Sequence, residues 1–131
     1  MVSSTSGAEV VREAYAFVER GDARQLRTLL ADDVFWQPAA NTPRHVAEGG
    51  DEVAQRLAWR STIHRLRVVD VLPLGDRVVV TLNGRRMHHL GARWWDWRVY
   101  QVVTVRGGLI ARIEDYSRHR DALAAAGVQP R

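Results

Sequence analysis

Cysteine and lysine are both absent from the 131 residues. Without cysteine, the chain has no disulfides, no thiolate metal sites and no cysteine nucleophile. Without lysine, it cannot form the Schiff bases on which lysine catalysis depends. All 19 basic residues are therefore arginine, and their very high pKa accounts for much of the sequence pI of about 10.6. The net charge is only +4, so the chain is weakly rather than strongly basic.

Long apolar runs and concentrated charge are also missing. No stretch approaches the roughly 18 apolar residues of a transmembrane helix. The first residues, "MVSSTSGAE", lack the basic start and apolar segment of a signal peptide. The arginines are scattered rather than gathered with stacking aromatics, as in a nucleic-acid-binding stripe. We therefore expect no nucleic-acid partner, no membrane partner and a cytoplasmic location.

Motifs for metals, nucleotides and serine nucleophiles are absent as well. The chain contains no HExxH motif, no G-x-S-x-G elbow and no glycine-rich loop between a strand and a helix. On a strand, His88 and His89 point to opposite faces, so the pair does not chelate a metal. We expect neither a metal nor an organic cofactor.

The first half of the sequence has the pattern of three helices. Ser6 with Glu9 forms a capping box, apolar residues follow at helical spacing, and Gly21 ends the helix. Asp22 caps a second helix, and a short strand, "VFW", precedes Pro38. After a loop at 38–50, Asp51 caps a third helix with Val53 and Leu57 on its apolar side.

From about residue 63, the spacing at which apolar residues recur changes from about 3.6 residues, as in a helix, to 2 residues, as in a strand. The pattern predicts strands at about 63–74, 77–89, 94–106 and 109–117, then a helix at about 118–126 that ends at Gly127. Helices followed by antiparallel strands predict one α+β domain over 8–127, with short tails at 1–7 and 128–131. A chain of this length has enough residues for one hydrophobic core.

The last hairpin suggests a strand register. If "GG" at 107–108 is a two-residue loop, Arg106 pairs with Leu109, and a regular ladder then places Tyr100 opposite Asp115 and Val102 opposite Ile113. One sheet face then carries Asp96, Arg98, Tyr100 and Asp115, while the other carries Trp95 and Trp97. A three-residue loop at 91–93 adds His88 opposite Asp96. A slip of one residue would exchange the two faces.

The segment "ARWWDWRVYQ" has two interpretations. Burial alone would turn Trp95 and Trp97 toward the helices and leave Asp96 and Arg98 in water. Alternatively, both faces are buried, with the polar set around a cavity and the tryptophans against a second subunit. Periodicity does not choose between these interpretations.

Over nearly its whole length the chain resembles the SnoaL-like branch of the nuclear transport factor 2-like (cystatin-like) α+β proteins. The resemblance rests on the "ERGD" break between two helices, the entry "LLADDVFW" to the first strand, and the ending "GGLIARIEDYSRHRDALAAAG". It implies a cone in which three helices pack on a strongly curved, mainly antiparallel sheet and enclose a pocket. It also implies a homodimer through the outer sheet face, which would bury Trp95 and Trp97.

The resemblance excludes some reactions but does not identify a single one, because proteins of one fold can have several functions. Where related ketosteroid isomerases place a general base, this chain has Trp36-Gln37-Pro38, and most catalytic residues of limonene epoxide hydrolases are unmatched. One position does match the family: the aspartate of an Asp-Tyr pair on the last strand falls on Asp115 in "EDYSRH". The resemblance thus makes Asp115 the best candidate site residue.

Asp115 is the predicted general base of a cofactor-independent reaction on a mostly apolar, carbonyl-bearing molecule, polyketide-like or terpenoid-like. At the bottom of the cone, with Arg98 as a diagonal neighbour, its carboxylate would be largely ionised at neutral pH. Tyr100 and Arg98 would stabilise an oxyanion, and His88 with Asp96 would shuttle a proton. The predicted pocket-lining residues are Trp36, Trp59, Tyr15, Phe17, Ile113 and Val102.

Other interpretations of the same residues remain open. The Asp–Arg–Tyr group could satisfy a partly polar interior without catalysing anything. The large aromatic residues could equally belong to an ordinary core. The domain could bind a ligand or dimerise without catalysis, or Asp115 could open an epoxide with a bound water.

Overall fold

The computed structural model describes residues 7–39, 46–85 and 98–128. Helices and strands alternate in the first half, and strands dominate the second. In chain order the elements are α1 Gly7–Arg20, α2 Ala23–Arg27, β1 Leu30–Gln37, β2 Ala47–Glu48, α3 Gly50–His64, β3 Arg67–Leu74, β4 Arg77–Asn83, β5 Arg98–Arg106, β6 Leu109–Tyr116 and α4 His119–Ala125. Among the described segments, no helix is both long and apolar enough to cross a bilayer.

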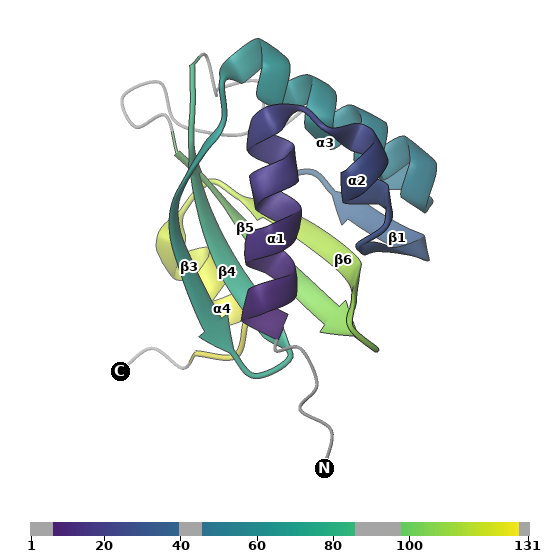
Figure 1. The fold of residues 1–131 in the computed structure, drawn as a ribbon. Coiled ribbons are helices and arrows are strands. Elements are labelled where there is room, and N and C mark those ends of the chain that lie inside the picture. Colours follow the sequence, from purple (N-terminus) through teal and green to yellow (C-terminus); the bar gives the residue numbers. More distant parts are fainter. Residues whose placement is uncertain (1–6, 40–45, 86–97, 129–131) are drawn as a thin grey trace.

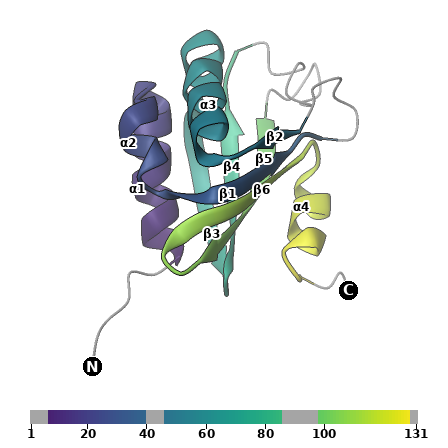
Figure 2. The same ribbon diagram turned by 90° about the vertical axis from the view of Figure 1, so that its right-hand side faces the viewer.

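The strands form one curved sheet in the order β2-β1-β6-β5-β4-β3. Neighbouring strands are antiparallel except for β1 and β6, which are parallel. Helices α1, α2 and α3 cover the inner face, and α4 packs on the outer face (Figures 1 and 2). The prediction of an α+β fold with a curved, mainly antiparallel sheet is confirmed.

The predicted break between the first two helices is present. Gly21 adopts a positive φ of 68°, a conformation that glycine accepts at little cost. The carboxylate of Asp22 then accepts a hydrogen bond from the backbone N–H of Gln25 at 3.1 Å, which caps α2. The "ERGD" sequence therefore ends one helix and starts the next within three residues.

Helix α3 differs from the prediction at both ends. Its N-cap is Gly49, whereas Asp51 lies inside the first turn and accepts from Arg27 at 2.9 Å. The helix continues to His64, because His64 is still buried at helical spacing from Ser61, and ends where Arg65 turns left-handed at φ 52°. Strand β3 consequently starts at Arg67, four residues later than predicted.

A β-bulge changes the register between β5 and β6. The predicted pair Arg106 and Leu109 is present, but Thr104 pairs with Arg112 while the next residue, Val105, pairs with Ile110. Ala111 is therefore an extra residue in β6 without a partner of its own. A bulge of this kind bends the strand and shifts every later pair by one position.

Two clusters of apolar side chains lie on opposite faces of the sheet. The larger one, under α1–α3, includes Val11, Trp36, Leu57 and Ile113, each at most 1% exposed. The smaller one lies under α4 and joins Ala122 and Ala126 to Val79, Tyr100 and Val102. Because α4 covers part of the outer face, both sides of β5 are buried.

Arg27 holds the start of α3 against β1. Its guanidinium pairs with Asp32 at 2.6 Å and with Asp51 at 2.9 Å, and donates to the carbonyl of Leu30 at 3.1 Å. Gly50 leaves room for this arrangement, since a Cβ there would stand 2.2 Å from Arg27 Cζ. The two carboxylates raise the pKa of Arg27 by hydrogen bonding and by their charge.

We expect Gly50→Ala to destabilise the fold by about 1 kcal/mol, because the new methyl group displaces the guanidinium from exposed, individually weak contacts. In an Arg27→Ala background the same substitution is expected to be neutral or stabilising, since alanine restricts the unfolded chain more than glycine does. Urea unfolding of the two single variants and the double variant measures both effects. An equal loss in both backgrounds would contradict this account.

Candidate functional site

Asp115 is a buried acid on β6 with a defined set of hydrogen-bond donors. Its side chain faces the inner side of the sheet, and the residue is 4% exposed. Its Oδ1 accepts from the indole Nε1 of Trp36 at 2.9 Å and from the amide Nε2 of Gln101 at 2.8 Å. Two N–H donors on one carboxylate oxygen favour the ionised form of the acid.

The network continues from Gln101 to Tyr15, whose hydroxyl donates to the amide Oε1. An ionised carboxylate only accepts hydrogen bonds, so the Gln101 amide must turn its NH₂ toward Asp115. Its oxygen then faces Tyr15, which must donate. Every hydrogen bond in the chain from Tyr15 to Asp115 thus points toward the acid.

Four different elements supply these side chains. Tyr15 comes from α1, Trp36 from β1, Gln101 from β5 and Asp115 from β6. The pairing of Trp36 with Ile113 and of Gln101 with Asp115 sets the strand residues side by side. All four residues are less than 5% exposed, so displacing any of them would leave a buried polar group without a partner.

Burial raises the pKa of Tyr15 well above its ordinary value, and the negative charge of Asp115 raises it further. Tyr15 therefore stays protonated in the folded protein, as its role as a donor requires. The pKa of Tyr116 is also raised, first by burial and then by the charge of Glu114 and the hydrogen bond to it.

Alkaline titration should reveal Tyr15 directly. Because its folded pKa is raised above an unfolded value of about 10, its stabilising effect is complete below pH 10 and declines as the pH rises through the folded pKa. Absorbance at 295 nm follows the ionisation of the three tyrosines, and without lysine no other side chain titrates near pH 10 to obscure the change in stability. We expect Tyr15→Phe to cost about 1–3 kcal/mol at neutral pH, by leaving Gln101 Oε1 without its donor, and to cost less above pH 10.

The matched variant is Tyr116→Phe, which removes a half-buried hydroxyl from the outer face and should change stability little. A stability loss for Tyr15→Phe that stays constant from pH 8 to pH 11 would contradict the assignment of a raised pKa to Tyr15.

The predicted register is wrong for Tyr100 and Val102. Tyr100 pairs with Tyr116, and Gln101 pairs with Asp115. Because the bulge at Ala111 shifts the ladder by one residue, both Tyr100 and Val102 lie on the outer face. There Tyr100 stacks on His119, with ring centroids 5.0 Å apart.

Other predicted residues divide between the interior and the surface. Tyr15, Trp36 and Ile113 are buried in the inner cluster, and Phe17 packs against it while partly buried. Trp59 is 57% exposed rather than lining the interior, because it lies on the opposite side of α3 from the buried face. Arg98, the first residue of β5, is exposed and pairs with Asn83 of β4.

The predicted shuttle of His88 and Asp96, and the predicted interface residues Trp95 and Trp97, lie outside the described residues. Within the described ranges, no three histidine or acidic side chains are grouped to hold a metal ion.

Sequence reasoning missed Gln101 as a site residue. A signal was present, since Gln101 is the one amide side chain in "VYQVV" and its strand is buried on both sides. A buried amide needs partners for its N–H and C=O groups, so a glutamine in such a run indicates a polar network.

Open space reaches the acid from the end of the sheet. A hollow of about 270 Å³ lies where β1 and β6 end and α4 begins. Its walls include Pro38, Asp115, Ser117 and Asp121. This volume is slightly below the roughly 300 Å³ at which typical small-molecule sites begin.

The curved sheet with helices on its inner face is the fold of solved nuclear transport factor 2-like and cystatin-like proteins. A cystatin-like protein from Silicibacter pomeroyi superimposes with a TM-score of 0.67 at 23% identity, covering 89% of this chain and 79% of that one. A provisionally assigned polyketide cyclase from Sinorhizobium meliloti superimposes with a TM-score of 0.63 at 15% identity, covering 82% of this chain and 93% of that one. A de novo designed protein with a curved β-sheet superimposes with a TM-score of 0.65 at 20% identity, covering 95% of this chain and 97% of that one. At these identities the likeness is one of fold alone.

The model of the SnoaL-like domain matches residues 11–113, more than half of the chain. The protein therefore belongs to the SnoaL-like family, and the resemblance seen in the sequence is confirmed. No curated protein matches the sequence.

Proposed function

We propose that the protein binds a small, mostly apolar, carbonyl-bearing molecule and that Asp115 removes the proton alpha to its carbonyl without a cofactor. The observation that carries this proposal is the buried carboxylate, held by Trp36 and Gln101 on one oxygen. A base that is fixed in position and protected from water is suited to proton transfer. Cyclisation, isomerisation and elimination next to a carbonyl can all begin with this step.

Asp115 is the proton acceptor of this step. Its Oδ1 accepts N–H donors from Trp36 and Gln101, which hold the carboxylate in place. The abstracted proton would go to this carboxylate. Breaking the C–H bond leaves its electron pair on the substrate as an enolate, and a later step returns the proton to carbon or oxygen.

The surroundings of the acid support an apolar substrate. On its inner side the acid adjoins a cluster of aliphatic and aromatic side chains, where a charged group would lose hydration. The hollow at the end of the sheet is also lined by Glu114 and Asp121, which disfavour an anionic ligand. The fold neighbour from Sinorhizobium meliloti that is provisionally named a polyketide cyclase is consistent with polyketide-like substrates. Terpenoid-like substrates rest on the family resemblance. The proton shuttle formed by His88 and Asp96 remains part of the proposal.

Deuterium exchange tests this proposal without knowledge of the substrate. The protein is incubated in D₂O with a panel of apolar ketones and β-keto esters, and incorporation at the alpha carbon is measured by mass spectrometry. Exchange above the buffer rate supports the proposal. Binding without exchange would indicate a ligand-binding domain, and formation of diols from apolar epoxides would indicate epoxide opening; either result would overturn it.

We also propose a homodimer through the part of the outer sheet face that α4 leaves uncovered, with Trp95 and Trp97 in the interface. The family resemblance supports this arrangement. A monomer in sedimentation velocity at micromolar concentration would contradict it.

A further inference from the structure

The outward ridge of α3 exposes apolar side chains between arginines. We call Arg56, Trp59, Arg60, Ile63 and Arg65 the α3 patch. Trp59 is 57% exposed and Ile63 is 49% exposed. They are four residues apart on one helix and therefore lie next to each other. Their side chains project from the side of α3 opposite the buried residues, away from the core.

Arginines outnumber acidic residues around these two side chains. Between residues 53 and 69 the chain has four arginines and no acidic residue. The guanidinium of Arg60 lies 5.4 Å from the centre of the Trp59 ring. Arg56 pairs with Glu52 at 3.1 Å, but both side chains are more than two-fifths exposed, so this pair remains hydrated.

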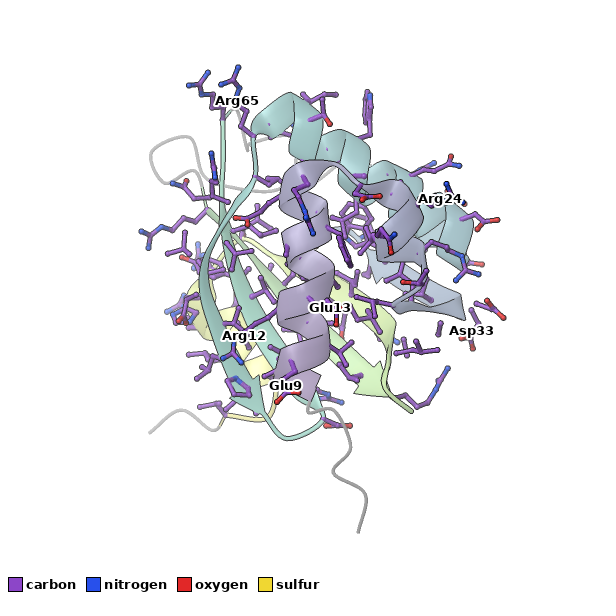
Figure 3. The ribbon with its side chains drawn as sticks, viewed as in Figure 1. Glu9, Arg12, Glu13, Arg24, Asp33 and Arg65 are labelled. Atoms are coloured by element: carbon purple, nitrogen blue, oxygen red, sulfur yellow. The ribbon has the colours of Figure 1, made fainter. Side chains whose placement is uncertain are left out.

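Two neighbouring segments add positive charge at the same end of the molecule. The turn at Gly21, which follows Arg20, lies close to α3. A Cβ atom placed on Gly21 would be only 3.1 Å from Thr62 Oγ1. The backbone N–H of Arg85 donates to the carbonyl of His64 at 2.6 Å. Figure 3 shows Arg65 projecting away from the body of the protein where α3 ends. The nearby acid Glu19 accepts from the backbone of Val68 at 2.9 Å.

We propose that the α3 patch docks on a lipid bilayer that contains anionic phospholipids. Indole rings are favoured at the boundary between headgroups and acyl chains, and Ile63 beside Trp59 adds a second apolar contact. The exposed guanidinium groups of Arg56 and Arg65 can form bidentate contacts with lipid phosphates. An exposed ridge of two apolar side chains can enter a headgroup layer, but it is smaller than the core of a standard protein interface.

This inference is independent of the proposed function. It differs from the sequence-based expectation of no membrane partner. The apolar face of α3 packs on the core, so contact with a membrane would be peripheral and would involve only the exposed side chains of Trp59 and Ile63 with the arginines beside them.

Co-sedimentation with vesicles tests the proposal. We expect the full chain to bind vesicles of phosphatidylcholine mixed with phosphatidylserine, and to bind pure phosphatidylcholine much more weakly. Trp59→Ala should weaken binding about fivefold to tenfold by removing the main apolar contact. Arg65→Glu changes the charge by two units and should weaken binding about 25-fold at low salt.

The matched control is Arg12→Glu, which makes the same charge change on the exposed side of α1, where Figure 3 shows Arg12 far from Arg65. It should weaken binding much less than Arg65→Glu. Equal losses for the two variants, or no binding to anionic vesicles, would overturn the proposal. Retention on poly-glutamate that exceeds vesicle binding and is unchanged by Trp59→Ala would overturn it in favour of an acidic protein partner. Thermal unfolding of each variant confirms that it is folded.

Discussion

Asp115→Asn is expected to reduce alpha-deuterium exchange at least about 100-fold, the usual contribution of a positioned general base. The asparagine amide cannot accept the substrate proton at neutral pH. Its Oδ1 can still accept from Trp36 and Gln101, so the two hydrogen bonds at this oxygen are preserved. The loss should therefore appear in the rate of exchange while ligand binding and the unfolding midpoint change little.

The control for this variant is Asp33→Asn, which makes the same chemical change on the surface of β1. Asp33 pairs with Arg106 at 3.1 Å, and both side chains are largely exposed, so its loss should cost at most about 1 kcal/mol. Figure 3 shows Asp33 at the edge of the molecule. Undiminished exchange in Asp115→Asn, or an equal loss in Asp33→Asn, would rule out Asp115 as the base.

The largest stability effect is expected for Gln101→Glu. This substitution replaces an N–H donor to Asp115 with a second buried carboxyl group. Burial and the neighbouring charge raise the pKa of the introduced group above its unfolded value of about 4.3. A rise of about three units corresponds to about 4 kcal/mol of lost stability once the pH exceeds the folded pKa.

The sign of the pH dependence distinguishes this mechanism from simple loss of packing. Since the folded variant holds a proton that the unfolded chain releases, its stability is greatest below pH 4 and falls as the pH rises through the folded pKa. The control Gln101→Leu removes the same donor without adding a titratable group, so its cost should vary little over that range. Urea unfolding between pH 4 and pH 8 measures both. A cost of Gln101→Glu that is independent of pH would contradict the proposed network.

Local signals predicted the elements well because they depend on neighbouring residues. The Asp22 cap and the turn at 107–108 each follow from a few side chains and are present in the structure. The face assignment of β5 failed because the bulge at Ala111 has no local signature: alanine is compatible with a regular ladder, and the bulge serves the curvature of the whole sheet. Trp59 was misplaced for a simpler reason, since it follows Leu57 by two residues, which is more than half a turn of helix.

The candidate site was predicted only in part for the same reason. The family resemblance located Asp115 because a position on the last strand can be matched from sequence. Its partners Trp36 and Gln101 lie 79 and 14 residues away in the chain, and only the strand pairing brings them to the acid. Tyr15 adds a contact across 86 residues from a helix on the other side of the core.

The extra residue at Ala111 decides which side chains of β5 face the interior. With it, β5 presents Gln101 to Asp115 and places Tyr100 under α4. Without it, an uninterrupted ladder would turn the tyrosine inward and the amide outward with no change in the sequence of β5. A single insertion or deletion near this point in related chains would therefore replace the partners of the acid in one step, although substitutions within β5 would leave them facing as they do.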